Sequence, residues 1–315
     1  MDNSAALLAP EMADASVPGP FAVLACLAMA VFYVAILYSP TLIFRLPPPT
    51  SLNNFMIRRF VCAVVSSVAS VFLTCCLLPI KTLRVWPLVF DSFGIRLDHL
   101  WLAVVFPVFL TSLLYGGSFV SNVLHLAGTW KEEKFVHLTL QGVMNGIHSN
   151  RANVMAWRNY VVAPLTEELV FRACMIPLLL CGGYKTYNII FLSPIFFSLA
   201  HLNHFLELYY LQSYSFFKAA AIVGIQLGYT VIFGWYAAFL FIRSGNLLAP
   251  IVAHIFCNVM GLPVLASPRA RGLTIIASVS GCVAFLWLLF PLTNPKLYND
   301  RTDSCRCWQG YCYWK

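Results

Sequence analysis

Long apolar stretches without Asp, Glu, Lys or Arg recur along most of the chain. The charge-free runs are 15–44, 60–80, 99–130, 186–206, 219–242, 244–268 and 272–295. A helix needs about 20 mostly apolar residues to cross a bilayer, so each run is long enough for one crossing. These runs are apolar on all sides, and a helix satisfies its own backbone groups in lipid, so the pattern predicts helices.

One further segment, 159–182, is apolar except for Glu167, Glu168 and Arg172. With it, the pattern predicts an all-α fold, a polytopic membrane helical bundle of about eight transmembrane helices. The predicted helix cores are 20–41, 60–80, 100–120, 159–182, 187–206, 219–242, 246–263 and 273–293. No Lys or Arg precedes the first core, which we expect to be a retained helix rather than a cleavable signal peptide.

Composition supports a membrane protein. Of the 315 residues, 60% are hydrophobic and 10% are charged, whereas soluble domains carry about 25% charged residues. The net charge of +8 suits a protein beside anionic lipid headgroups. No basic cluster lies on a soluble domain, so the expected partner is the lipid bilayer and no nucleic acid is expected. Lys and Arg are spread almost evenly over the two predicted sides, which leaves the orientation open.

No repeat or separate soluble domain interrupts this pattern, so we expect a single integral membrane domain over 1–315. The longest polar connection is 121–158, and a short polar tail containing cysteines occupies 296–315. Gly224 and Gly228 form a pair of small residues four positions apart, which predicts that another helix approaches closely there.

Three charged residues lie where charge is costly. A charged side chain in mid-membrane costs at least about 2.5–3.5 kcal/mol, yet Glu167, Glu168 and Arg172 fall within one apolar segment. Glu168 and Arg172 are four residues apart and can pair on one helix face. Glu167 is rotated by about 100° and is expected to face a cavity. Pro164 predicts that the helix starts or bends just before them.

Polar residues also mark two later helices. His201 and His204 end the fifth predicted helix, and His254 lies inside the seventh with Asn258 one turn away on the same face. The simpler interpretations are a buried Glu168–Arg172 pair that fixes helix packing and histidines that are hydrogen-bonded structural residues. Neither accounts for Glu167.

A carboxylate and an imidazole together can deprotonate a water and later protonate a leaving amine. An Asn amide and a second His can donate hydrogen bonds to a developing oxyanion. The set therefore suits hydrolysis of an amide bond. The chain has no HExxH helix and no GxSxG turn. A zinc ion held by His201, His254 and a Glu stays open as an alternative, but no spacing requires a metal, so we expect no metal and no cofactor.

Three motifs occur in order on these segments: EELVFR at 167–172, FFSLAH at 196–201 and HIFCN at 254–258. They fit the patterns EExxxR, FxxxH and HxxxN, and the chain resembles the intramembrane proteases that process CaaX proteins and bacteriocins. The stretches PLTEELVFRACM, FGWYAAFLFIRSG and PLTNPKLY are most similar to the eukaryotic type II CaaX prenyl endopeptidases, the Ras-converting enzymes. The region 158–263 would then form the catalytic core helices.

The resemblance implies a glutamate-type intramembrane protease with a cone-shaped cavity open to the bilayer. The enzyme would remove the C-terminal tripeptide (aaX) from CaaX proteins that carry farnesyl or geranylgeranyl, small GTPases among them. It implies that Glu167 and His201 activate water. His254 and Asn258 would form the oxyanion hole, and Glu168 and Arg172 would support the site or hold the substrate. The family is expected in the endoplasmic reticulum membrane as a multi-pass protein.

Two other functions are compatible with intramembrane Glu, His and Arg residues. One is an ion or proton transporter, which would favour discontinuous helices in two related halves; the sequence shows no internal repeat. The other is a catalytically silent membrane scaffold of the same fold, because a fold does not guarantee activity.

Overall fold

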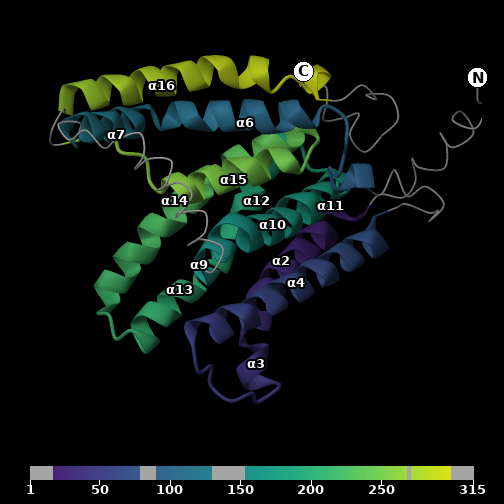
Figure 1. Cartoon of the computed structure of the whole chain (residues 1–315). Coiled ribbons are helices and arrows are strands. Elements are labelled where there is room, and N and C mark those ends of the chain that lie inside the picture. The colour runs from purple at the N-terminus through teal and green to yellow at the C-terminus, as the bar shows by residue number, and fades with distance from the viewer. Residues whose placement is uncertain (1–16, 79–89, 130–152, 268–270, 299–315) are drawn as a thin grey trace, which may run out of the picture.

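The computed structural model describes residues 17–78, 90–129, 153–267 and 271–298. Within these ranges the ordered elements are all helical (Figure 1). The α-helices are α2 (Gly19–Ala35), α3 (Ser39–Leu42), α4 (Leu52–Leu77), α6 (Leu100–Leu114), α7 (Gly116–Thr129), α9 (Val154–Trp157), α10 (Ala163–Glu168), α11 (Met175–Cys181), α12 (Thr186–Ala200), α13 (Asn203–Leu206), α14 (Phe216–Ser244), α15 (Leu248–Met260) and α16 (Arg271–Leu292). The shorter turns are the 3₁₀ segments η1 (Ile36–Tyr38) and η5 (Pro295–Leu297) and the π segments η2 (Arg158–Val162), η3 (Leu169–Cys174) and η4 (Glu207–Leu211).

The chain is a multi-pass membrane protein. Among the described residues, five helical stretches are long and apolar enough to cross a bilayer, and the bent pair α6–α7 can be a sixth. The five are Gly19–Leu42, Leu52–Leu77, Thr186–Tyr210, Phe216–Ser244 and Arg271–Leu292. The sequence predicts about eight crossings, and the structure has helix in each of the eight predicted segments. The other three predicted segments are not single straight apolar helices of sufficient length. Segment 100–120 is bent, segment 159–182 carries three charged residues, and α15, in segment 246–263, has only 13 residues.

The third predicted helix, 100–120, is not one straight helix. It breaks at Tyr115, and α7 leaves α6 at 72°. Gly116 starts α7 against α16, where a Cβ would lie 2.6 Å from the carbonyl oxygen of Ala277. A side chain there would collide with the neighbouring backbone, so glycine permits the close approach of α7 to α16.

The predicted close approach at Gly224 and Gly228 is wrong. A Cβ at either position would meet nothing described within 4 Å. The close contact lies further along α14, at Gly234, where a Cβ would be 2.6 Å from the Cβ of Pro194 on α12. Small residues at regular spacing leave one face of a helix open to close contact, but the position of the neighbouring helix decides which part of that face it contacts.

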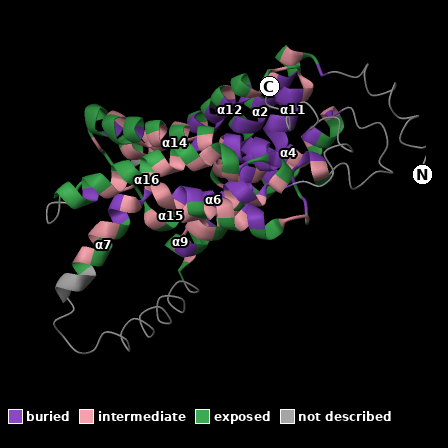
Figure 2. Ribbon diagram, turned by 90° about the horizontal axis from the view of Figure 1, so that it is seen from above, coloured by how far each residue is buried: buried purple, intermediate pink, exposed green. Residues whose placement is uncertain are grey.

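The most buried helix is the one that carries the predicted carboxylates. Through η3 and α11, the side chains from Val170 to Leu180 are all buried, and they pack with α2, α4, α12 and α14 in the main core cluster. Figure 2 shows buried residues gathered where α2, α11 and α12 meet, and exposed residues along α14 and α16. Large apolar side chains are exposed on those outer helices, Phe217 and Trp287 among them, as expected for surfaces that face lipid.

Parts of two predicted segments lie outside the described residues. The polar connection 121–158 is helical through Thr129 in α7 and again from Val154 in α9, and 130–152 lie outside the description. Of the predicted tail 296–315, only the residues through Tyr298 are described.

Candidate active site

The helix that carries Glu167 and Glu168 is interrupted on both sides. The short helix α10 lies between the π turns η2 and η3, in one run from Val154 to Cys181. Insertions of this kind occur often at functional sites. The carbonyl of Asn159 would accept from the N–H four or five residues later, at Ala163 or Pro164. The N–H of Ala163 donates instead to the oxygen of Arg158, and Pro164 has no N–H. The helix backbone therefore offers the Asn159 carbonyl no donor at these two positions. The Asn258 side chain supplies one, with its Nδ2 2.8 Å from that oxygen. The proline thus bends the hydrogen-bond pattern without ending the helix.

Glu168, Arg172 and His254 form a buried charged cluster. Glu168 is 0% and Arg172 1% exposed, and the Arg172 Nε lies 3.2 Å from the Glu168 Oε2, as the four-residue spacing predicts. The His254 Nδ1 lies 2.7 Å from the Glu168 Oε1. A carboxylate only accepts, so His254 donates from Nδ1. Its Nε2 points toward Glu167, whose Oε2 is 3.9 Å away.

Aromatic rings complete the surroundings of Arg172. Its guanidinium carbon lies 4.6 Å from the ring centre of Phe197 and 5.9 Å from that of Phe233, within the range of cation–π attraction. Its Nη1 and Nη2 have no hydrogen-bond partner among the described residues. The charge of Arg172 is therefore held by one carboxylate and two ring faces.

His201 is fixed in one tautomer at the end of α12. Its Nδ1 lies 2.9 Å from the carbonyl oxygen of Phe197, one turn earlier. A carbonyl only accepts, so the proton is on Nδ1 and the neutral ring presents an unprotonated Nε2. The ring also packs edge-on against Phe197, with 4.8 Å between the ring centres. This is the form of histidine that can take a proton.

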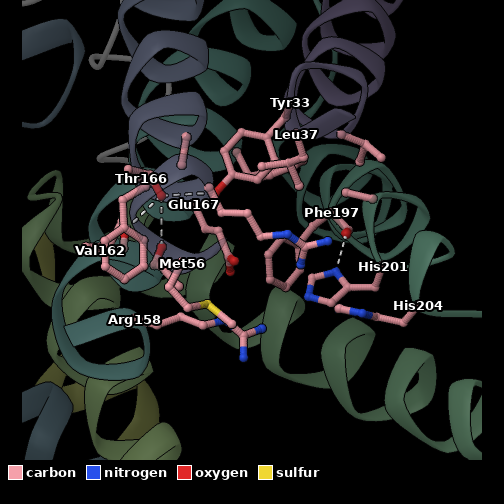
Figure 3. A pocket seen from close by; sticks show the side chains of 17 residues that line it. Tyr33, Leu37, Met56, Arg158, Val162, Thr166, Glu167, Phe197, His201 and His204 are labelled. Atoms are coloured by element: carbon pink, nitrogen blue, oxygen red, sulfur yellow. Dashed lines mark hydrogen bonds between the residues drawn. The ribbon is translucent and has the colours of Figure 1, made fainter. Parts of the chain in front are cut away.

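Glu167 and His201 line one cavity of about 90 Å³ (Figure 3), and a single water needs roughly 10–15 Å³. The other lining residues come from α2, η1, α4, η2, α10, η3, α12 and α13: Tyr33, Val34, Leu37, Met56, Arg59, Phe60, Ala63, Arg158, Val162, Ala163, Thr166, Phe171, Phe197, Ala200 and His204. His254 and Asn258 do not line it. His254 approaches Glu167 from the side of the buried cluster, while Asn258 is exposed.

Several cavity residues lie outside the motifs that sequence analysis identified. The Tyr33 hydroxyl on α2 is 3.0 Å from the Thr166 Oγ1, and Thr166 donates its own proton to the Val162 carbonyl, 2.7 Å away. Tyr33 is therefore the donor to Thr166. Arg59 on α4 is paired with Glu207. Tyr33 gave no signal because it lies in an all-apolar run, whereas Arg59 could have been noticed at the edge of a predicted core.

The zinc alternative needs several ligands in one place. Among the residues that the structure describes, no group of three or more His, Cys, Asp or Glu side chains is close enough to hold a metal ion. His254 has its Nδ1 bound to Glu168. His201 has its Nδ1 on a backbone carbonyl, so only its Nε2 faces the cavity.

Comparison with known proteins gives one consistent result. Residues 149–260 match the family model described as type II CAAX prenyl endopeptidase Rce1-like. The chain is 52% identical over 306 residues to "CAAX prenyl protease 2" of Arabidopsis thaliana, covering 95% of this chain and 98% of that protein. It is 34% identical over 304 residues to "CAAX prenyl protease 2" of Homo sapiens, covering 92% of this chain and 88% of that protein. No solved structure matches the chain.

Proposed function

The chain belongs to the type II CAAX prenyl endopeptidases and is a CAAX prenyl protease, and on that premise we propose that it removes aaX from CaaX proteins whose Cys carries an isoprenoid. The geometry that supports the proposal is the shared cavity of Glu167 and His201. A carboxylate and a neutral imidazole there can both accept a proton from one water. Neither the transporter nor the silent scaffold has a comparable observation in its favour.

We assign water activation to Glu167 and His201. One of them takes a proton as the water oxygen attacks the scissile carbonyl, and the tetrahedral intermediate forms. That proton then passes to the amide nitrogen as the C–N bond breaks, so the tripeptide leaves as an amine and the prenylated Cys becomes the new C-terminus. Groups placed for such transfers contribute about 10²–10⁴-fold to a rate.

His254 and Asn258 are proposed to stabilise the oxyanion. Because Glu168 holds one proton on the His254 Nδ1, the ring can donate from Nε2 only when it carries both protons. Asn258 uses one Nδ2 proton on Asn159, which leaves its second proton for substrate. A substrate that seats against both groups would bring them to the reacting carbonyl.

Glu168 and Arg172 are proposed to support the site from behind rather than to touch the reacting atoms. Glu168 orients His254, and Arg172 balances the charge of Glu168 at 3.2 Å. Groups that orient a functional side chain in this way reduce the reorganisation needed during the reaction.

An apolar groove continuous with the cavity suits the lipid part of such a substrate. It has a volume of about 580 Å³ and lies between α2 and the α12–α13 region, within the roughly 300–1,000 Å³ of small-molecule sites. Val34 and Ala200 line both the groove and the cavity. An isoprenoid in the groove would place the adjacent peptide beside Glu167.

The proposal also includes a location and a number of membrane crossings. We place the enzyme in the endoplasmic reticulum membrane, with about eight crossings. In Figure 1 the α3–α4 and α13–α14 connections lie at one end of the bundle and the α11–α12 and α14–α15 connections at the other, as helices that cross in alternate directions require.

The test of the substrate is cleavage of a CaaX peptide by membranes that contain the protein. The farnesylated peptide should release its tripeptide, and the same peptide without farnesyl should not. An Ala200→Trp variant, which narrows the junction of groove and cavity, should lower the cleavage rate. Equal cleavage of both peptides would contradict a site built for lipidated substrates, and no release from folded wild type would contradict the proposed reaction.

A further inference from the structure

Besides His201, three basic side chains line the cavity that contains Glu167: Arg59, Arg158 and His204. Two of them, Arg59 and His204, contact the carboxylate of Glu207. Arg59 forms an ion pair with it and also lies 4.7 Å from the ring centre of Phe55. The His204 Nδ1 is 3.3 Å from the second oxygen of Glu207. The carboxylate of Glu207 therefore balances this basic pair.

Arg158 is different. Among the residues that the structure describes, the guanidinium of Arg158 has no ion pair and no hydrogen bond, whereas each neighbouring carboxylate lies beside another basic side chain. Glu168 is paired with Arg172, Glu207 with Arg59, and Glu167 lies toward His254. An arginine that faces a cavity without a counterion offers a planar set of donors suited to a carboxylate or a phosphate.

The position of Arg158 on its helix sets its distance from Glu167. Arg158 and Glu167 lie on one continuous helical run and are separated by 167 − 158 = 9 residues. At the α-helical rise of 1.5 Å per residue this would be about 13 Å along the axis, and the π turn η2 within the run shortens it. Three extended residues span roughly 10 Å. A tripeptide from the scissile bond to its C-terminus thus nearly covers the interval, and the long arginine side chain can bridge the rest.

We propose that Arg158 binds the C-terminal carboxylate of the substrate and so sets the cut three residues from the chain end. The inference rests on the proposed function, since it takes the substrate to be a prenylated chain with a free C-terminus. Arg158 is a binding residue in this account: it touches the substrate but not the scissile bond.

The apolar groove determines which end of the substrate lies on which side of Glu167. Figure 3 shows Arg158 across the Glu167 carboxylate from Tyr33 and Leu37, and the groove adjoins the cavity on the α2 side through Val34. An isoprenoid in the groove, the scissile bond at Glu167 and the carboxylate at Arg158 then form one path. The two ends of the substrate are held on opposite sides of the reacting bond.

The test compares two farnesylated CaaX peptides of one sequence, one ending in a free carboxylate and the other in a carboxamide. Wild type should cleave the acid with a kcat/KM on the order of 10- to 100-fold above that of the amide, the range for one lost hydrogen-bonded charge contact. Arg158→Gln should lower cleavage of the acid to the rate of the amide and leave the amide rate unchanged. The loss should lie mainly in KM, because the contact exists before and during the reaction.

Two further variants keep the inference falsifiable. Arg158→Lys, which retains a point charge, should keep part of the preference. Arg58→Gln is the matched control: Arg58 donates to the Pro47 carbonyl and does not line the cavity, so its preference should equal that of wild type. Wild type that cleaves acid and amide equally, or Arg158→Gln that loses both alike, would overturn the role of Arg158 and leave the protease proposal standing. Wild type that cleaves neither peptide would refute the proposed function instead.

Discussion

Four ionisable side chains meet at the centre of the bundle. Glu167, Glu168, Arg172 and His254 are linked by contacts of 2.7, 3.2 and 3.9 Å. The Glu168 carboxylate has the Arg172 guanidinium and the Nδ1 proton of His254 beside it. An opposite charge next to a buried charge lowers the cost of keeping it away from water. Loss of one of these partners therefore changes the energy of the others.

This interdependence predicts a non-additive effect of substitutions. Arg172→Met leaves Glu168 buried without its cation, which should cost about 3–5 kcal/mol of folding free energy. Adding Glu168→Gln removes the stranded charge, while the amide oxygen can still accept from the His254 Nδ1. The double variant should therefore unfold at a higher temperature than Arg172→Met alone, measured by thermal unfolding in detergent. A double variant that loses the sum of the two single losses would contradict the coupling.

At the residue level, the sequence predicted only contacts between residues that are close together in the chain. The Glu168–Arg172 pair follows from four-residue spacing. The tautomer of His201 depends on the Phe197 carbonyl, which becomes free because α12 ends there. The engagement of His254 by Glu168 joins residues 86 positions apart, and no local rule specifies such a contact. The roles of these residues in the reaction stay predictions.

At the level of elements, packing contacts decide where a helix can change its course. The π turns beside α10 let a proline remain inside a membrane helix, and Asn258 on α15 takes over the carbonyl that the proline leaves without a donor. Further along, α12 and α14 meet at Gly234 and Pro194. This contact matters to the site because α12 carries His201 directly after its last turn.

Glycine substitutions on α14 test this packing. Gly234→Ala places a Cβ 2.6 Å from Pro194, and such overpacking typically costs about 1–3 kcal/mol. It should lower thermal stability in detergent and reduce peptide cleavage by displacing α12. Gly224→Ala is the matched control on the same helix, with no described atom within 4 Å of an added Cβ, and should gain up to about 1 kcal/mol from helix propensity. The reverse order of stability would contradict the assigned contact.

At the level of the whole molecule, hydrophobic pattern predicted the helices better than their crossings. All eight predicted segments contain helix, because long apolar runs have few other structures available in lipid. The 72° bend after α6 and the short α15 depend on contacts with other helices, which no single segment specifies. The cavity likewise combines α2 and α4 with later helices, so sequence motifs located only part of its wall.

Eight crossings can be tested through the connections. If α14 and α15 both cross, epitopes inserted at 213–215 and at 262–267 should lie on the same side of the membrane, and one at 182–185 on the other side. Protease protection of the epitopes in sealed vesicles measures this directly. Opposite sides for 213–215 and 262–267 would show that α15 does not cross and would reduce the crossing number.

We assign activation of the hydrolytic water to Glu167 and His201. The most direct measurement is the rate of tripeptide release from a farnesylated CaaX peptide by wild type, Glu167→Gln, His201→Ala and the control Asp98→Asn, each with and without a chelator. Asp98 lies outside the cavity. We expect Glu167→Gln and His201→Ala to fold but to lose about 10²–10⁴-fold in rate, whereas Asp98→Asn and the chelator should change little. Release by folded Glu167→Gln at the wild-type rate would contradict the assignment, and loss of wild-type release on chelation would make these residues metal ligands instead.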